Sequence, residues 1–394
     1  MQISDLKIGI PREIMDGEKR VAASPDSVVK MKEAGAQVYL EQNAGQGAFI
    51  SDEDYLASGA EIVKGPKELY GNVDVVLKVK EPCFNHEYGC HEVEFMQENS
   101  LLICFLHPAN PVNHDMVRML AQKKITSLTL DGIPRISRAQ QMDALTSMSS
   151  IAGYKSAILA ANLLARFVPM MPTASGVIQP AQFLVVGTGV VGLQAIGMVK
   201  RMGGKVKSLD IRKEANEQSK SLGAELVPFD VPDELAAGEG GYAKRLPPEW
   251  YQKERDILAE LVQTCDAIIL SALIPGEESP ILLEKSMIEK MKKGSVIIDI
   301  AVDQGGNCEV TRPGENYVYE GITVSGIMNL PATLAIDATK MISFNMWHLL
   351  TYLAKHGLVM NTEDEIIKSS LVTHQGEVVH RGTLLAMERQ KSKA

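Results

Sequence analysis

The sequence predicts an α/β protein of two domains, each built on a Rossmann-like, doubly wound parallel sheet. Apolar strand patterns alternate with helical patterns along the chain, and such alternation is typical of largely parallel sheets. A glycine-rich turn follows one of these strands and opens a helix, as in doubly wound folds. The 394 residues exceed what one ordinary core accommodates, so two domains are expected.

The domain boundary is expected where a long helical pattern begins at Ala144. The first domain then comprises residues 1–143 together with 337–394, and the second comprises residues 144–336. The C-terminal tail is assigned to the first domain because the second already has its strands without it, whereas the first lacks a closing helix.

The elements are placed from apolar periodicity and from capping and breaking residues. Ser24 and Pro25 provide a cap and a first-turn proline for a helix over 24–34. The helical pattern from Ala144 continues to about Phe167, where a group of prolines ends it. Strands are predicted over 7–11, 37–40, 73–79, 101–106, 125–128, 183–186, 205–209, 224–227, 267–270, 296–300 and 322–324.

The composition excludes several classes of protein. The formal net charge of −9 argues against a nucleic-acid binder, which needs a basic face. Five scattered cysteines suit a reducing compartment without disulfides. The N-terminus lacks the pattern of an export signal, and no apolar run is long enough for direct membrane insertion. No metal site is expected, because the spacing of His86, Cys90 and His91 matches no zinc pattern.

The most informative motif is the run FLVVGTGVVGLQAIG at 183–197, which places three glycines at G-x-G-x-x-G spacing between a predicted strand and a predicted helix. The first glycine permits a tight turn, the second lets the backbone approach a pyrophosphate, and the third lets the helix pack on the strand. Phosphates would then lie at the helix N-terminus. The residues expected to bind the cofactor here are Gly187, Gly189, Val190, Val191 and Gly192.

An acidic residue follows at the spacing expected for recognition of an adenosine ribose. Asp210 ends the next strand, about 20 residues past Gly192, and would accept a hydrogen bond from the ribose 2′-hydroxyl. Its charge would repel a 2′-phosphate, which favours NAD over NADP, although Arg212 follows two residues later. Ile211 is placed in the same subsite. On position alone, Asp210 could also be a simple strand-end acid.

Two further segments are expected to lie against the cofactor. One follows an apolar strand, and ligands of doubly wound folds bind at the carboxyl ends of strands. The other, 236–253, is too long and polar for a tight connection and is predicted to be a lid loop, with a disordered insertion as the alternative. The residues assigned to the cofactor in these segments are Ser271, Ala272, Leu273, Gly241, Tyr242 and Ala243.

Five stretches resemble the NAD(H)-binding subunits of proton-translocating nicotinamide nucleotide transhydrogenases, whose nearest relatives are the alanine dehydrogenases. With the N-terminal region, the resemblance covers nearly the whole chain. The runs PRISRAQQMD and GGYAK are specific to the transhydrogenase subunits. The five stretches are 134–143, 162–180, the fingerprint at 183–197, 240–244, and 272–276 with 294–299.

The resemblance implies an NAD(P) transhydrogenase that passes hydride between NADH on this chain and NADP⁺ on a partner subunit, and it leaves open the Si-specific or Re/Si-specific type. Arg135, Gln140 and Asp143 would position the nicotinamide in a cofactor cleft between the two domains. Because the chain contains a single fingerprint, NADP(H) would bind to another chain. From spacing alone, these three residues could instead form a solvated helix-entry loop with a surface ion pair.

The same resemblance implies partners and a location. The chain would be a homodimer that binds membrane-spanning and NADP-binding transhydrogenase subunits. It would be cytoplasmic and peripheral on the inner face of the membrane, held there through those subunits.

Four residues depart from the transhydrogenase pattern or are shared with the alanine dehydrogenases, and they support an alternative. By that resemblance, Arg20 would hold a substrate carboxylate and Lys80 would donate to the carbonyl or imine. His107, whose ordinary pKa is ~6.5, would be the acid/base, and Asp303 would support the reacting groups. Each residue also has a structural interpretation, as a surface cation, a structural histidine or a turn cap. A third possibility is a catalytically inert NAD-binding module.

Overall fold

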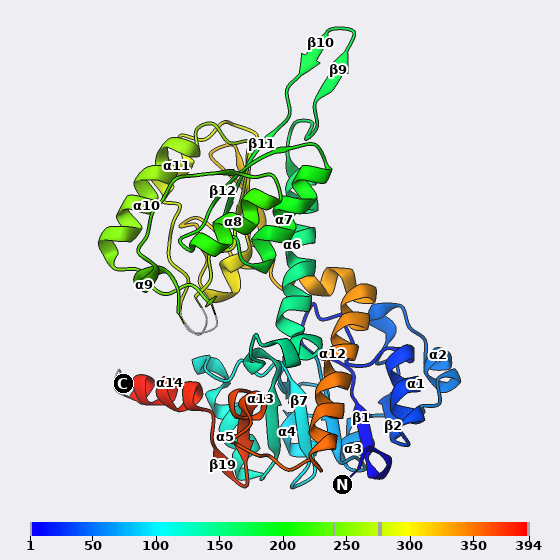
Figure 1. The fold of residues 1–394 in the computed structure, drawn as a ribbon. Coiled ribbons are helices and arrows are strands. Elements are labelled where there is room, and N and C mark those ends of the chain that lie inside the picture. Colours follow the sequence, from blue (N-terminus) through cyan, green and yellow to red (C-terminus); the bar gives the residue numbers. More distant parts are fainter. Residues whose placement is uncertain (1, 239–240, 275–277, 392–394) are drawn as a thin grey trace. The chain divides into compact units, whose positions relative to one another are not determined.

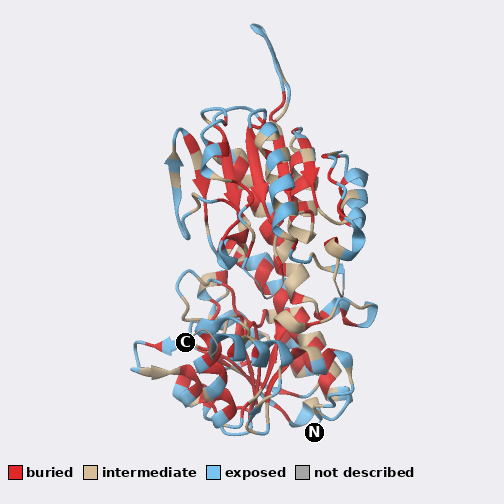
Figure 2. Ribbon diagram, turned by 90° about the vertical axis from the view of Figure 1, so that its left-hand side faces the viewer, coloured by how far each residue is buried: buried red, intermediate tan, exposed pale blue. Residues whose placement is uncertain are grey.

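The computed structural model describes residues 2–238, 241–274 and 278–391. The chain divides into two compact units. Unit 1 comprises Met1–Met148 and Ala332–Ala394, and unit 2 comprises Ser149–Pro331. In each unit, buried strands lie at the centre and helices cover them (Figures 1 and 2). The α/β fold predicted from strand–helix alternation is therefore confirmed.

Unit 1 contains an eight-stranded sheet. Six parallel strands have the order β3-β2-β1-β4-β7-β8, the 3-2-1-4-5-6 order of a doubly wound fold. The antiparallel strands β18 and β19 extend the sheet beyond β8. The strand order reverses between β1 and β4, which marks the switch point. The strands are β1 (Lys7–Ile10), β2 (Gln37–Glu41), β3 (Glu61–Val63), β4 (Val75–Leu77), β7 (Leu101–Cys104), β8 (Thr126–Thr129), β18 (Leu371–His374) and β19 (Glu377–Val378).

Unit 2 repeats this arrangement in a seven-stranded sheet. Its parallel strands have the order β13-β12-β11-β14-β15-β17, and β16 pairs antiparallel at the edge. Continuous apolar runs form β14 and β15, and all residues of both strands are buried, as parallel sheets covered on both faces require. The strands are β11 (Gln182–Val186), β12 (Lys205–Leu209), β13 (Glu225–Leu226), β14 (Ala267–Leu270), β15 (Val296–Asp299), β16 (Asn316–Tyr319) and β17 (Ile322–Ser325).

Helices begin where capping residues satisfy free backbone donors. Ser24 caps α1 (Pro25–Glu33): its hydroxyl accepts from the Ser27 amide, and the Ser27 hydroxyl accepts from the Ser24 amide. Within unit 1, α12 (Ala335–Lys355) packs on α1. The other helices are α2 (Asp52–Ala57), α3 (Pro66–Tyr70), α4 (Glu92–Phe95), α5 (His114–Gln122), α6 (Ala144–Leu163), α7 (Val190–Arg201), α8 (Lys213–Ser221), α9 (Asp233–Ala236), α10 (Pro248–Leu261), α11 (Lys285–Ile288), α13 (Glu365–Ser370) and α14 (Arg381–Lys391).

Two short hairpins lie outside the large sheets, and sequence analysis missed both. One is β5 (Phe84–Asn85) with β6 (Cys90–His91), and the other is β9 (Met171–Thr173) with β10 (Gly176–Ile178). Figure 2 shows the β9–β10 hairpin extending from its unit as an exposed ribbon. The predicted loop over 236–253 is also shorter than expected, because α10 begins at Pro248, a first-turn proline.

Candidate functional site

The glycine turn of unit 2 lies at the switch point of its sheet, between the carboxyl ends of β11 and β14. Gly187 has a φ of +82°, a conformation that favours glycine. A Cβ added to Gly187 would lie 2.7 Å from backbone atoms of Ser271 and Ala272. The Ser271 hydroxyl donates to the Gly187 carbonyl at 2.7 Å, which joins the two strand ends. Gly187 therefore allows the turn and the carboxyl end of β14 to lie in close contact.

The start of α7 requires glycine at two more positions. A Cβ on Gly192 would lie 2.1 Å from the Gly187 carbonyl oxygen. From the other side, a Cβ on Gly153 in α6 would lie 2.2 Å from the Val191 carbonyl oxygen. Gly189 is the N-cap of α7, and the nearest atom to a Cβ there is the Arg212 Nη2 at 3.9 Å. Sequence analysis missed Gly153, which α6 brings against the turn.

The carboxylate of Asp210 is already engaged within the chain. It accepts the Thr188 amide at 2.6 Å and three groups of Arg212: the backbone amide at 2.9 Å, Nε at 2.9 Å and Nη2 at 2.8 Å. Asp210 is buried. Burial alone would lower the pKa of Arg212, but the hydrogen bonds and charge of Asp210 hold it above its usual value. The predicted ribose acid thus also orders the glycine turn and neutralises Arg212.

A buried carboxyl on α10 lies in the electrostatic field of Asp210. Glu254 is 3% exposed. Burial, and secondarily the charge of Asp210, raise the pKa of Glu254 to about 8. Burial, and to a smaller extent the charge of Asp210, therefore disfavours the ionised form of the Glu254 carboxyl. Nothing in the sequence pattern indicated Glu254, since its interaction with Asp210 arises from packing of α10.

The Asn307 and Asp299 side chains hold the backbone just beyond the carboxyl end of β14. The Asn307 side chain accepts from the Ala272 amide at 3.0 Å and donates to the Ala272 carbonyl at 3.0 Å. The Asp299 carboxylate in turn accepts the Asn307 amide at 3.0 Å. Of the predicted segment, Ser271 is buried and Ala272 and Leu273 are half-buried. Residues 275–277 lie outside the described residues. They include Pro275 and Gly276, which belong to the stretch 272–276 that resembles the transhydrogenase subunits.

Much of the predicted lid loop is described. A bridge pairs Ala237 with Ala243, and the Gly238 amide donates to the Tyr242 carbonyl at 2.8 Å. The Arg212 Nη1 donates to the Gly241 carbonyl at 3.0 Å. Arg212 therefore connects this loop to Asp210 within unit 2. Gly240 of the predicted loop lies outside the described residues.

The predicted nicotinamide residues lie in unit 1 at the entry to α6. Asp143 caps that helix: its carboxylate accepts the Thr146 amide at 2.8 Å and the Thr146 hydroxyl at 2.6 Å. Arg135 and Gln140 are exposed. The backbone of this segment is held by α12, since the Asn345 side chain donates to the Gln141 carbonyl at 2.8 Å.

The alternative set of dehydrogenase-like residues falls mostly at the carboxyl ends of unit 1 strands. Arg20 is buried and pairs with Glu18, with Nε to Oε1 at 2.7 Å and Nη2 to Oε2 at 2.5 Å. Lys80 follows β4 and is half-buried. Asp303 is an exposed residue of unit 2, so the structure groups only Arg20, Lys80 and His107 within one unit.

His107 follows β7 in an unusual conformation. Its φ of 43° is left-handed, which is uncommon for residues other than glycine and concentrates at functional sites. Its Nδ1 lies 2.8 Å from Asp131 Oδ1, and its amide donates to Asp131 Oδ2 at 2.8 Å. Burial alone would lower the pKa of His107, but the Asp131 carboxylate reverses this and raises it. Sequence analysis identified His107 but missed Asp131, which follows β8.

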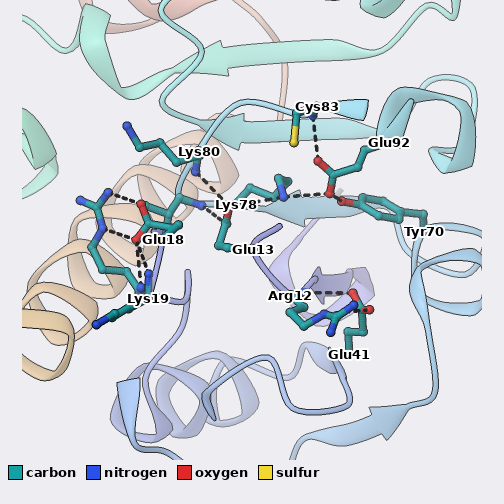
Figure 3. Close-up of polar contacts among 12 residues, drawn as sticks. Arg12, Glu13, Glu18, Lys19, Glu41, Tyr70, Lys78, Lys80, Cys83 and Glu92 are labelled. Atoms are coloured by element: carbon teal, nitrogen blue, oxygen red, sulfur yellow. Dashed lines mark hydrogen bonds and ion pairs between the residues drawn. The ribbon is translucent and has the colours of Figure 1, made fainter. Parts of the chain in front are cut away.

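Beneath Lys80 lies a buried charged network at the unit 1 switch point (Figure 3). The Lys78 Nζ is 2.9 Å from Glu92 Oε1 and 3.4 Å from Glu13 Oε2. The Tyr70 hydroxyl donates to Glu92 at 3.0 Å. Sequence analysis assigned no role to any of these four residues.

Two negative findings apply to the described residues only. Within 2–238, 241–274 and 278–391, no group of three or more His, Cys, Asp or Glu side chains could hold a metal ion. Over the same ranges, every helix is too short or too polar to cross a bilayer.

Comparison with known families and proteins follows the division of the chain. Residues 9–152 match the family model "Alanine dehydrogenase/PNT, N-terminal domain", and residues 156–381 match "Alanine dehydrogenase/PNT, C-terminal domain".

Three similar proteins represent both branches of this family. The chain is 42% identical to an NAD(P) transhydrogenase alpha subunit of Rhodospirillum rubrum, over 95% of this chain and 98% of that protein. The crystal structure of a transhydrogenase from Sinorhizobium meliloti matches with a TM-score of 0.81 at 32% identity, over 95% of this chain and 99% of that one. The structure of an L-alanine dehydrogenase matches with a TM-score of 0.80 at 29% identity, over 97% and 99%.

Proposed function

The chain belongs to the alanine dehydrogenase/PNT family, and within it we propose that this protein is the NAD(H)-binding alpha subunit of a proton-translocating NAD(P) transhydrogenase. The observation that carries the proposal is the higher identity to transhydrogenase alpha subunits than to alanine dehydrogenases, along almost the full length. The glycine corner of unit 2 supplies the physical basis for binding the cofactor.

The residues present fit a dinucleotide. Added Cβ atoms at Gly187 and Gly192 would meet backbone within 3 Å, so these glycines let the turn pack closely at the start of α7. At Gly189, the N-cap of α7, the nearest atom to an added Cβ is 3.9 Å away, which leaves room for a phosphate to approach the backbone. Free amides at a helix N-terminus attract phosphate. Asp210 places a carboxylate beside this turn, which suits a ribose hydroxyl and opposes a 2′-phosphate. When bound, NAD(H) supplies the hydride, and the protein supplies placement and electrostatics.

The polar segment before α6 would position the nicotinamide. Gln140 both donates and accepts hydrogen bonds, which suits a carboxamide or a ribose. Arg135 is exposed in the same segment, while Asp143 fixes its end by capping α6. Since hydride transfer between two nicotinamides moves no proton on the substrate, this function requires no general base.

The second cofactor and the pump would belong to partner chains. With one fingerprint in this sequence, NADP(H) would bind to a separate subunit, and proton movement would occur in membrane-spanning subunits. We infer a cytoplasmic chain that is peripheral on the inner face of the membrane through these partners.

One observation favours a second candidate, an NAD-dependent amino-acid dehydrogenase. His107 is held by Asp131 in a left-handed conformation at a strand end, and despite burial this carboxylate raises the His107 pKa. Lys80 is close enough for its charge to act on His107, although it does not reverse that shift. An acid/base next to a cation is what oxidation of an amino acid requires. Arg20, however, is already neutralised by Glu18.

The decisive experiment measures both reactions with the purified chain. With NAD⁺ and L-alanine alone, we expect no NADH to form. With NADH, an NADP⁺ analogue and an NADP(H)-binding subunit, we expect hydride transfer that Gln140→Ala lowers about ten- to hundredfold, as loss of substrate positioning does. NADH affinity should change little. Gln141→Ala is the matched control, since only the backbone carbonyl of this exposed neighbour is used.

Other outcomes would overturn the proposal in distinct ways. Brisk alanine oxidation by the chain alone, abolished in His107→Gln, would establish the dehydrogenase. NADH binding with neither reaction would leave an inert NAD-binding module. Transfer that Gln140→Ala leaves unchanged would remove the role given to the segment before α6.

We further propose a homodimer, supported by the β9–β10 hairpin. This hairpin extends from unit 2 and carries exposed apolar side chains, including Met170 (55%), Val177 (56%) and Ile178 (37%). Clustered exposed apolar groups mark interaction sites in soluble proteins. Val177→Asp with Ile178→Asp is expected to shift light-scattering mass from twice the 42.9 kDa chain to the single chain. A wild-type chain that is monomeric at micromolar concentration would contradict the dimer.

A further inference from the structure

The buried network of unit 1 occupies the place where doubly wound sheets bind their ligands. Glu13 follows β1 and Lys78 follows β4, the two strands that flank the switch point. The side chains of Glu13, Lys78 and Glu92 are all 3% exposed or less. Burying ionised side chains costs free energy unless they are paired and hydrogen-bonded, so the contacts made by this network determine the local structure.

The carboxylates of this network bind the backbone that follows β4 (Figure 3). The Val79 amide donates to Glu13 Oε1 at 2.6 Å, and the Lys80 amide donates to Glu13 Oε2 at 3.4 Å. The Cys83 amide donates to Glu92 Oε2 at 2.9 Å. Two buried carboxylates thus hold the segment Val79–Cys83, which we call the β4 turn.

The β4 turn connects this network to the partly exposed groups near His107. It carries Lys80 and Glu81, and the Asn113 side chain donates to Glu81 Oε1 at 3.3 Å and to the His107 carbonyl at 3.4 Å. The Phe105 amide also donates to the Val79 carbonyl at 3.1 Å. A change in the β4 turn therefore changes the surroundings of His107.

The charges of the network do not balance. Two carboxylates share one ammonium. Glu18, which is paired with Arg20, also lies close enough to raise the pKa of Glu13, but its effect is the smallest of those acting there. Burial, opposed by Lys78, raises the pKa of Glu13 to about 7. Burial would lower the pKa of Lys78, but the carboxylates outweigh it and raise that pKa. The titratable and charged groups around Glu13 are Lys78, Glu92, Tyr70, Glu18, Cys83, Cys104 and the Arg12–Glu41 pair.

The described contacts of the two carboxylate oxygens of Glu13 are all with donors. Oε1 faces the Val79 amide, and Oε2 faces the Lys80 amide and the Lys78 ammonium, all of which are donors. A hydroxyl on Oε1 would oppose the Val79 amide, and one on Oε2 would oppose both the Lys80 amide and the Lys78 ammonium. Protonation also removes the negative charge that attracts both amides, so it weakens the hold of Glu13 on the β4 turn.

We propose that Glu13 is a positioning residue whose protonation releases the β4 turn, so that one buried proton sets the placement of Lys80 and Glu81. This proton acts within unit 1, whether the chain serves transhydrogenation or amino-acid oxidation.

Amide hydrogen exchange tests this directly. In the wild-type chain, after correction for intrinsic exchange rates, protection of the Val79 and Lys80 amides is expected to rise about tenfold or more as pH increases through about 7, since each amide regains a charged acceptor. Glu13→Gln, which places a donor where the proton would lie, is expected to keep both amides in the weakly protected state at every pH.

Two variants serve as controls. Glu41→Gln removes a neighbouring buried carboxylate that holds Arg12 rather than the β4 turn, and it should retain the pH-dependent step. His107→Gln should also retain the step, which separates it from titration of the histidine. If protection in the wild-type chain is constant between pH 6 and 8, the proposal is wrong, whether or not Glu13→Gln folds.

Discussion

Replacing Gly192 with alanine is expected to weaken NADH binding about ten- to hundredfold, the effect of 1–3 kcal/mol of overpacking. The added Cβ would lie 2.1 Å from the Gly187 carbonyl oxygen, and backbone atoms cannot move aside as a flexible side chain can. The strain must displace either α7 or the turn at Gly187, and both contribute the surface proposed for the diphosphate.

The same helix provides a matched control. Gly197 also lies in α7, but nothing lies within 4 Å of a Cβ added there. Gly197→Ala should therefore leave NADH affinity unchanged and stabilise the chain by roughly 0.5–1 kcal/mol, the usual gain from replacing a helical glycine. Titration calorimetry and thermal melts of both variants separate binding from folding. Equal NADH affinity in Gly192→Ala and Gly197→Ala would contradict the assignment of this corner to the cofactor.

The second large effect is expected at Asp210. Its carboxylate holds Arg212 through Nε and Nη2, so the guanidinium is neutralised beside the glycine turn. In Asp210→Asn, the amide offers one acceptor oxygen and a competing donor, and the bidentate pair is lost. Arg212 then becomes available for a 2′-phosphate.

We expect Asp210→Asn to lower NADH affinity and raise NADPH affinity, each on the order of tenfold, as removal of one charged recognition contact does. Asp233→Asn is the control, because Asp233 pairs with Lys213 at the surface of the same unit. Fluorescence titration with both nucleotides gives the ratio of affinities. A ratio that stays at the wild-type value in Asp210→Asn would show that this acid does not discriminate between them.

The glycine turn could be predicted because its information is local. The spacing of Gly187, Gly189 and Gly192 reports backbone conformation within one strand–turn–helix segment, and the structure has that segment between β11 and α7. Gly153 is equally close to the turn, but it comes from α6 and no local pattern reveals the contact. Packing between distant segments is what sequence spacing does not encode.

The same distinction explains which charged partners were missed. Resemblance indicated His107 and Lys80 but not the carboxylates that contact them. Asp131, which binds His107, follows β8, the neighbour of β7 in the sheet. Glu13, which binds the Lys80 amide, follows β1, the neighbour of β4. The sequence also predicted the position of Asp210 but not its ion pair with Arg212, because that pair depends on side-chain geometry.

Errors of secondary structure had physical causes too. The prolines near Pro172 suggested an irregular stretch, yet Pro172 lies in β9 of an isolated hairpin, where a missing donor costs little. The polar composition of 248–253 suggested a loop, although Pro248 begins an amphipathic helix whose buried residues include Glu254.

Unit 1 is assembled from two segments separated by all of unit 2, and this affects how the protein can be made. On the ribosome, unit 2 is complete once Pro331 has emerged, whereas unit 1 still lacks α12, β18 and β19. Domains tend to fold as units during synthesis. Until translation delivers β18, the N-terminal sheet is therefore expected to have β8 paired with β7 on one side only, and the exposed outer edge of β8 is prone to aggregation.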